Sequence, residues 1–338
     1  MELKRNQTEL TGILGIDSIN TLGNIKDYEK WKEYRKIYKE ASLLEIITKY
    51  PTQIDFELNA TCNLRCPMCP LSVESNNDKK DILFPFDIFC SIIDDGVSKG
   101  LKAIKLNYLN EPLLRKDLEK FIDYAKKAGV LDIYFSTNGL LLTEDRILSL
   151  VESGLDRIQI SIDAYSKDVY DKIRPGSNYE RVINNVLNLI DIRKRLNSIT
   201  PLIRVNFVRT ELNEHQLEDF VNFWRGKVEM IGSQEMVKPP KSSQELISKT
   251  TSKKPVFRCS FPYKQLVITA EGNVLPCCTF YGEEMVLGNI FNNLNTNRID
   301  LTQFWNCDKM NKLRELHVGG GYATNPVCKK CIDGAIFE

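Results

Sequence analysis

The chain contains few histidines and has almost no net charge. Only two histidines, His215 and His317, occur among its 338 residues, so acid–base catalysis built on histidine is not expected to be its main chemistry. Lys plus Arg number 46 against 45 Asp plus Glu, which gives no basic field for nucleic acid. The first residues lead into no apolar run long enough for a signal peptide or a membrane span. We therefore expect a cytoplasmic protein with neither nucleic acid nor membrane as a partner.

Cysteine, in contrast, is plentiful. Ten cysteines without an export signal predict a reducing compartment, where thiols serve metals or catalysis rather than disulfides. Cys62, Cys66 and Cys69 lie within eight residues, directly after the strand-like alternation of Ile54–Leu58. Soft thiolates this close together can hold zinc or an iron–sulfur cluster, although their spacing is not the usual zinc pattern of paired Cys-x2-Cys units. Three unrelated buried thiols are the plain alternative.

Strand and helix patterns alternate from about Pro51 to Val256. Strands are predicted at Gln53–Leu58, Ala103–Tyr108, Leu131–Ser136, Arg157–Asp163, Ile203–Arg209 and Val228–Gly232. Helices are predicted near 86–98, 114–128, 143–152, 178–195 and 213–225. This order predicts an α/β fold in which residues 51–235 form a partial (β/α)6 TIM-like barrel with right-handed crossovers. Such barrels place their chemistry at the C-terminal ends of the strands, where the three-cysteine loop lies.

Three further regions flank this barrel. Residues 1–50 are expected to be a helical extension, whose stripe at helical spacing (Tyr28, Trp31, Tyr34 or Arg35, Tyr38) would dock onto the protein's own body. Residues 236–256 have no apolar period and predict a linker. Residues 257–338 predict a small α+β domain with a hairpin turning at Glu271-Gly272-Asn273. Four cysteines of this domain could complete a tetrahedral all-thiolate site, with a zinc knuckle as the plain alternative: Cys259, Cys277, Cys328 and Cys331.

The spacing of Cys62, Cys66 and Cys69 resembles the signature of the radical S-adenosylmethionine (radical SAM) superfamily. The resemblance implies a [4Fe–4S] cluster on these thiolates, with one open iron that chelates SAM. Several strand ends resemble that family's SAM-binding turns, with Leu109 and Asn110 standing where the family has two glycines before Glu-Pro. The residues thus implied to contact SAM are Met68, Asn110, Glu111, Ser136, Asn138, Ser161 and Asp163.

The C-terminal cysteines resemble the auxiliary-cluster module called SPASM in its short "twitch" form. This resemblance implies one further [4Fe–4S] cluster on Cys259, Cys277, Cys328 and Cys331, with Cys278 as an alternative ligand to Cys277. Cys90 lies on an apolar helix face and is expected to be core. Cys278 is a candidate hydrogen-atom donor, and Arg209, at the end of the fifth strand, could face the substrate. A buried structural thiol and a surface salt bridge are the respective alternatives.

Together these resemblances imply an enzyme that cleaves SAM to a 5′-deoxyadenosyl radical and abstracts hydrogen from a substrate. We expect a small polar substrate of the sugar or aminocyclitol type, with oxidation by a dehydrogenase or epimerisation as the outcome. An electron donor such as flavodoxin or ferredoxin is expected as a partner. The alternative is a maturase that crosslinks or epimerises a ribosomally made peptide. A zinc-binding protein without redox chemistry is more remote.

Overall fold

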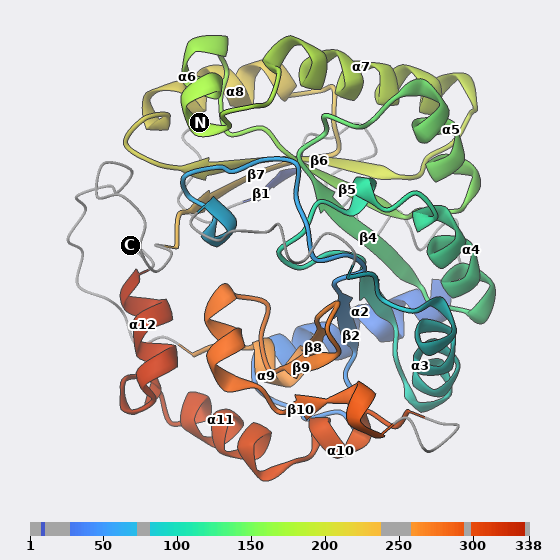
Figure 1. The fold of residues 1–338 in the computed structure, drawn as a ribbon, viewed down its shortest axis with the longest axis vertical. Helices are drawn as coiled ribbons and strands as arrows, with labels where there is room; N and C mark the ends of the chain where they lie inside the picture. The colour runs from blue at the N-terminus through green and yellow to red at the C-terminus, as the bar shows by residue number, and fades with distance from the viewer. Residues whose placement is uncertain (1–7, 11–27, 73–81, 238–257, 294–298, 335–338) are drawn as a thin grey trace.

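The computed structural model of this chain describes residues 8–10, 28–72, 82–237, 258–293 and 299–334. Six neighbouring parallel strands curl into an open barrel: β2 (Gln53–Phe56), β3 (Ala103–Lys105), β4 (Asp132–Thr137), β5 (Arg157–Ser161), β6 (Leu202–Arg209) and β7 (Met230–Glu235). Helices cover its outer face (Figure 1): α3 (Phe86–Lys99), α4 (Leu118–Ala128), α5 (Glu144–Glu152), α6 (Lys167–Ile173), α7 (Tyr179–Arg195) and α8 (Leu217–Trp224). The predicted partial TIM-like barrel is confirmed.

The alternation of side chains along the strands separates an apolar shell from a polar interior. Ile104, Ile133 and Phe135 are fully buried in the main hydrophobic core. Their chain neighbours Lys105 and Tyr134 point to the opposite face, because successive strand residues face opposite sides. Strand pairing sets Lys105 beside Tyr134 and so aligns the polar residues across the barrel. The barrel lumen, defined here as the interior enclosed by β2 to β7, is therefore lined by polar and charged side chains.

Two elements of the barrel region were not predicted. The strand β1 (Thr8–Leu10) pairs antiparallel with β7, so the N-terminal extension is not wholly helical. The short helix α6 precedes α7, and no helix was predicted there. The predicted linker, 236–256, lies almost entirely outside the described residues. Among the residues that are described, no helix combines the length and apolar character that crossing a membrane requires.

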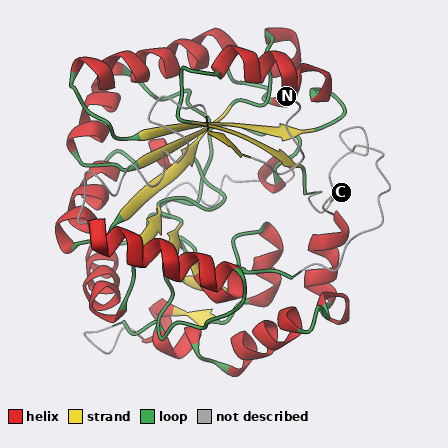
Figure 2. Ribbon diagram, turned by 180° about the vertical axis from the view of Figure 1, so that it is seen from behind, coloured by secondary structure: helices red, strands yellow, loops and turns green. Residues whose placement is uncertain are grey.

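The helix α2 (Tyr28–Ser42) closes the N-terminal end of the barrel. In Figure 2, which shows the molecule from the back of Figure 1, this helix crosses in front of the sheet. Trp31 and Tyr34 are each only 1% exposed and pack against residues at the starts of strands, among them Leu202 and Met230. The Tyr34 hydroxyl donates a hydrogen bond to Asp132 Oδ2 over 3.1 Å. Trp31 and Tyr34 thus dock onto the protein's own body, as predicted for the stripe, whereas Tyr28 at its start remains 54% exposed.

Replacing Trp31 by alanine should therefore destabilise the fold. Removal of a fully buried indole costs about 3–5 kcal/mol in the free energy of unfolding, which urea denaturation would measure. Tyr28→Ala is the matched control, because Tyr28 lies on the same helix but is 54% exposed. Its effect should stay within about 0.5 kcal/mol. Equal losses in the two variants would contradict the docking role of Trp31.

The C-terminal domain is joined to the barrel by a shared sheet. Its strands are β8 (Gln265–Ile268), β9 (Asn273–Leu275) and β10 (Gly288–Asn289), and its helices are α9 (Phe261–Lys264), α10 (Thr302–Trp305), α11 (Asp308–Val318) and α12 (Pro326–Gly334). The predicted hairpin is present, with β8 antiparallel to β9 across a turn in which Gly272 has φ of +84°. β8 also pairs in parallel with β2. One ten-stranded sheet therefore runs through both parts of the molecule.

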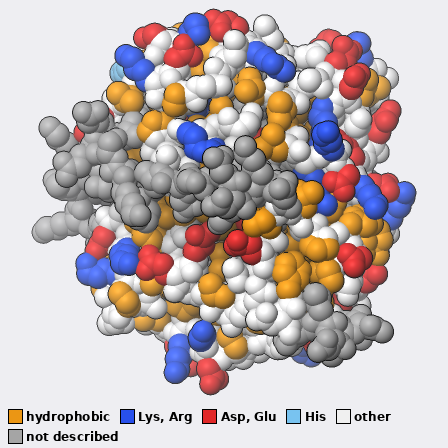
Figure 3. Space-filling view, in the orientation of Figure 1, with side chains coloured by type: hydrophobic (Ala, Val, Ile, Leu, Met, Phe, Trp, Pro, Cys, Tyr) orange, Lys and Arg blue, Asp and Glu red, His pale blue; other side chains and the backbone are white. Residues whose placement is uncertain are grey.

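The visible surface carries no region dominated by one charge. On the face shown in Figure 3, lysine and arginine side chains are interspersed with aspartate and glutamate. This agrees with the nearly equal numbers of basic and acidic residues in the sequence. The charged side chains that bear on function lie instead inside the barrel lumen.

Candidate active site

The three-cysteine loop lies at the C-terminal ends of the barrel strands. It borders a cavity of about 210 Å³, which also contains every residue that the sequence suggested for SAM. The structure thus brings together residues from four separate segments. They are Cys62, Cys66, Met68, Cys69, Asn110, Glu111, Ser136, Asn138, Ser161 and Asp163.

The three thiols of this loop are suited to ligation of a cationic group. Burial raises the pKa of Cys62 to about 12 and also raises the pKa values of Cys66 and Cys69. Thiolates in such surroundings need positive charge beside them, which cluster iron provides. No three His, Cys, Asp or Glu side chains of the described residues converge as ligands of one metal ion. The donor set fits an iron–sulfur cluster, whose thiolates bind separate irons.

The Glu111 carboxylate braces the cavity rather than pointing freely into it. It accepts hydrogen bonds from Leu113 N (3.1 Å), Thr137 Oγ1 (2.6 Å) and Asn138 N (2.8 Å). Burial raises its pKa, and these hydrogen bonds oppose the shift. Glu111 therefore ties the end of β3 to the end of β4.

Asn110 plays a comparable structural part in the turn after β3. Its Oδ1 accepts from Tyr108 N over 2.9 Å, and its Nδ2 donates to Asn59 Oδ1 over 2.8 Å. A glycine could make neither of these side-chain hydrogen bonds. The asparagine thus stabilises the turn by a route that the glycines of the family pattern lack.

Arg174 is a site residue that the sequence reasoning missed. It is 8% exposed, and its guanidinium binds the Asp163 carboxylate through Nε (3.1 Å) and Nη2. Its Nη1 donates to Cys66 Sγ over 3.8 Å. Asp163 also accepts from Val208 N over 2.7 Å and has a φ of +65°. A basic residue 11 positions after the Ser-x-Asp motif was the available signal, but the loop between α6 and α7 carries no recognisable pattern.

The barrel lumen below this cavity holds several charged side chains, and some of them are paired with an opposite charge or hydrogen-bonded within the protein. Arg157 forms a bidentate pair with Asp132, with both N–O distances at 2.8 Å. Asp55 accepts hydrogen bonds from Gln53 (2.6 Å) and Gln265 (3.1 Å). These groups are therefore satisfied within the protein.

Two further lumen cations, Lys105 and Arg204, form no bidentate pair of the kind that joins Arg157 to Asp132 among the described residues. Within the described part of the chain, the buried Nε of Arg204 has no hydrogen-bond partner. Lys105 stands opposite Asp55 in the pairing of β2 with β3, and its charge opposes the rise in the pKa of that carboxyl. Burial, followed by the nearby Arg157, lowers the pKa of Arg204. The Arg204 side chain lies against Gly232, where an added Cβ would approach its Nη2 to 2.3 Å. Lys105 and Arg204 are called the lumen cations below.

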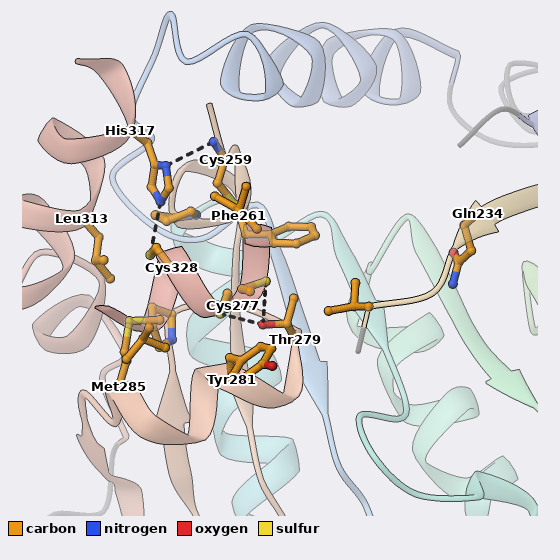
Figure 4. A pocket seen from close by; sticks show the side chains of 16 residues that line it. Gln234, Cys259, Phe261, Cys277, Thr279, Tyr281, Met285, Leu313, His317 and Cys328 are labelled. Carbon is orange, nitrogen blue, oxygen red and sulfur yellow. Dashed lines mark hydrogen bonds between the residues drawn. The ribbon is translucent and has the colours of Figure 1, made fainter. Parts of the chain in front are cut away.

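A second thiol set lies in the C-terminal domain. Cys259, Cys277, Cys328 and Cys331 border one cavity of about 360 Å³ (Figure 4). Burial raises the pKa values of all four thiols, those of Cys259 and Cys277 to about 12. Four thiols around one cavity, two of them buried and two partly buried, fit an iron–sulfur cluster by the same reasoning as the first site.

Cys277, rather than Cys278, faces this cavity with the other three cysteines. Cys278 packs instead against Tyr108, Val267 and Leu275. Burial raises the pKa of the Cys278 thiol to about 12, with a further contribution from Asp55 in the lumen. The adjacent cysteines therefore belong to different surroundings.

The remaining candidates lie apart from both cavities. Arg209 pairs with Glu214, the salt-bridge alternative that the sequence left open. Cys90 is partly buried and packs against the main core, as predicted. One hydrogen bond links the walls of the two cavities, because the Tyr108 hydroxyl donates to Thr279 O over 2.9 Å.

Comparison with known families agrees with this geometry. The sequence model of the radical SAM superfamily matches residues 56–222. The model of SPASM, an iron–sulfur cluster-binding domain, matches residues 259–332. The chain belongs to the radical SAM superfamily. It binds SAM at a [4Fe–4S] cluster and carries an auxiliary iron–sulfur cluster in its SPASM domain.

Individual relatives cover different shares of the chain. A "Probable GTP 3′,8-cyclase" of Methanocaldococcus jannaschii is 38% identical over 166 residues, which are 48% of this chain and 52% of the relative. The chain thus spans about half the length of the curated relatives that it matches. The fold resembles BtrN in complex with AdoMet and 2-DOIA (TM-score 0.53, 20% identity, 84% and 94% of the two chains). It also resembles Streptococcus suis SuiB bound to S-adenosylmethionine (TM-score 0.60, 16% identity, 86% and 73%).

These relatives correct the function expected from the sequence. The matched curated proteins are named as GTP 3′,8-cyclases, and a matched Drosophila melanogaster protein is named for molybdenum cofactor biosynthesis. The expectation of a sugar or aminocyclitol dehydrogenase or epimerase was therefore wrong, and so was the peptide-maturase alternative. The zinc-binding alternative is overturned by the match to an iron–sulfur cluster-binding domain. The motifs used for the expectation bind SAM and clusters, so they carried no information on the substrate.

Proposed function

We propose that this enzyme carries out a radical rearrangement of a phosphorylated purine nucleotide, with GTP as the first candidate. The observation that supports this substrate class is the pair of lumen cations: the buried Nε of Arg204 has no hydrogen-bond partner among the described residues, and Lys105 adds a second positive charge in the same lumen. The names of the curated relatives favour GTP and cyclisation over oxidation or epimerisation.

Phosphate oxygens would meet the chemical needs of the lumen cations. Leaving a buried guanidinium nitrogen without an acceptor costs free energy. Arginine offers a planar set of donors that suits phosphate, and lysine adds a compact charge. A triphosphate reaching between β3 and β6 would supply acceptors to both residues at once. Substrate binding would then relieve a cost that the folded protein carries without it.

The other residues have roles that follow from their positions. When bound, the cluster on Cys62, Cys66 and Cys69 supplies the electron that cleaves SAM to methionine and a 5′-deoxyadenosyl radical. Arg174 and Asp163 hold the wall of the SAM cavity beside Cys66. Ser136, Asn138 and Ser161 offer polar side chains to SAM, and Met68 an apolar surface to its adenine. The helix α2 excludes water from the far end of the lumen, and a flavodoxin or ferredoxin would deliver electrons.

Substrate-dependent SAM cleavage tests this proposal. Anaerobically reconstituted enzyme, given SAM and dithionite, should form 5′-deoxyadenosine faster with GTP than without it, whereas guanosine should have little effect. A bond at C3′ requires loss of the hydrogen there, so deuterium at C3′ of GTP should appear in 5′-deoxyadenosine. Cleavage that GTP does not alter, with no deuterium transferred, would exclude GTP as the substrate.

Variants of the lumen cations test the phosphate site itself. Arg204→Gln should raise the KM for GTP about 10- to 100-fold, since a hydrogen bond to a charged group contributes about 1.5–3 kcal/mol. Gly232→Ala should act in the same direction, because its methyl group would displace the Arg204 guanidinium without removing the charge. Lys127→Gln is the control, since Lys127 is an exposed lysine on α4. If Arg204→Gln and Gly232→Ala both left the KM for GTP unchanged, the proposed phosphate site in the lumen would be contradicted.

A further inference from the structure

His317 lies within the thiol set of the auxiliary site. It is 2% exposed, comes from α11, and borders the same cavity as the four cysteines. Figure 4 shows its ring between Cys259 and Cys328, with an interaction to each. The sequence analysis had used this residue only as one of two histidines, too few for acid–base catalysis built on histidine to be the main chemistry.

The two ring nitrogens of His317 have different partners. The backbone N–H of Cys259 donates to Nδ1 over 3.3 Å, so Nδ1 must carry its lone pair. In a neutral imidazole the proton then resides on Nε2. This Nε2 lies 3.6 Å from Cys328 Sγ. A sulfur that ligates iron as a thiolate can only accept, so the geometry gives an N–H···S hydrogen bond.

We infer that His317 is a positioning residue that raises the reduction potential of the auxiliary cluster by donating the Nε2 proton to the Cys328 thiolate. Reduction adds negative charge to a cluster and its sulfurs. A hydrogen bond to a ligand sulfur stabilises that charge and makes reduction easier. The inference does not depend on which substrate the enzyme takes.

A second polar group, Thr279, contacts the two cysteine ligands that His317 does not contact. Thr279 Oγ1 lies 3.7 Å from Cys277 Sγ and 3.8 Å from Cys331 Sγ. His317 contacts the other pair, through the backbone of Cys259 and the sulfur of Cys328. A hydroxyl has one proton to donate between two sulfurs, whereas the His317 proton is directed at one. Of these two groups, His317 therefore provides the more fixed donor.

The midpoint potential of the auxiliary cluster tests this inference. The measurement uses the full chain with Cys62, Cys66 and Cys69 replaced by alanine, so that only the auxiliary cluster contributes. His317→Met should lower the midpoint potential in a titration followed by electron paramagnetic resonance. His317→Gln keeps an N–H donor of similar reach and should restore part of the shift. In the reduced cluster, an exchangeable proton coupling seen with histidine should be absent with methionine.

A matched control separates hydrogen bonding from packing. Leu313 borders the same cavity but has no side-chain donor, so Leu313→Met should leave the potential and the proton coupling unchanged. Iron content of about four atoms per chain in each variant would show that the cluster is retained. If His317→Met loses the cluster, His317→Gln with the proton coupling intact still supports the inference. Equal potentials in the histidine and methionine proteins, or a matching shift in the leucine control, would overturn it.

Discussion

Replacing Cys62, Cys66 and Cys69 together by alanine should abolish SAM cleavage while sparing the auxiliary cluster. The three thiols form one ligand set, with Cys66 buried and Cys62 and Cys69 partly buried, and no other cysteine borders their cavity. The four C-terminal thiols line a separate cavity. Iron analysis of reconstituted protein should therefore fall from about eight atoms per chain to about four. Formation of 5′-deoxyadenosine should fall below detection.

Cys90→Ala is the matched control for this experiment. Cys90 is a partly buried thiol on α3 that lines neither cavity. It should keep about eight iron atoms and normal cleavage of SAM. Cleavage that persists in the triple variant would refute the assignment of the first cluster. A fall from about four iron atoms to none would instead show that the C-terminal thiols hold no iron–sulfur cluster.

The parts of the site that the sequence predicted are those fixed by short segments. Cys62, Cys66 and Cys69 lie in one loop, so their spacing can be read directly from the sequence. The polar residues at the ends of β3, β4 and β5 belong to strands with a clear apolar period. Parallel strands bring their C-terminal ends to one edge, so these residues had to meet. The hairpin at Gly272 was predictable for the same reason, because its turn and both strands are contiguous.

The parts that escaped prediction depend on contacts between distant segments. Arg174 reaches Cys66 across 108 positions, and His317 reaches Cys259 across 58. Arg204 looked like one polar residue in an alternating strand, and only the folded barrel shows that its buried Nε has no hydrogen-bond partner among the described residues. The pairing of β8 with β2 could not be read from either strand alone. Substrate recognition belongs to this second group, which explains why the expected substrate class was wrong.

The strongest test of the SAM cavity wall is removal of Arg174. In Arg174→Met the Asp163 carboxylate would remain fully buried without its cation, and breaking such a pair costs about 3–5 kcal/mol. Urea denaturation of the cluster-free protein should show this loss. The KM for SAM should also rise, because the guanidinium beside Cys66 is gone.

The pair Arg193 and Glu229 provides a control with matched burial and geometry. It is bidentate, with distances of 2.9 and 2.8 Å, and equally buried, but neither residue lines the SAM cavity. Arg193→Met should lose a similar unfolding free energy and leave the KM for SAM unchanged. Adding Asp163→Asn to Arg174→Met should recover stability, since the neutral amide oxygen can still accept from Val208 N. SAM cleavage should stay impaired in that double variant. If it recovered together with stability, Arg174 would be a structural residue without a role towards the cluster or SAM.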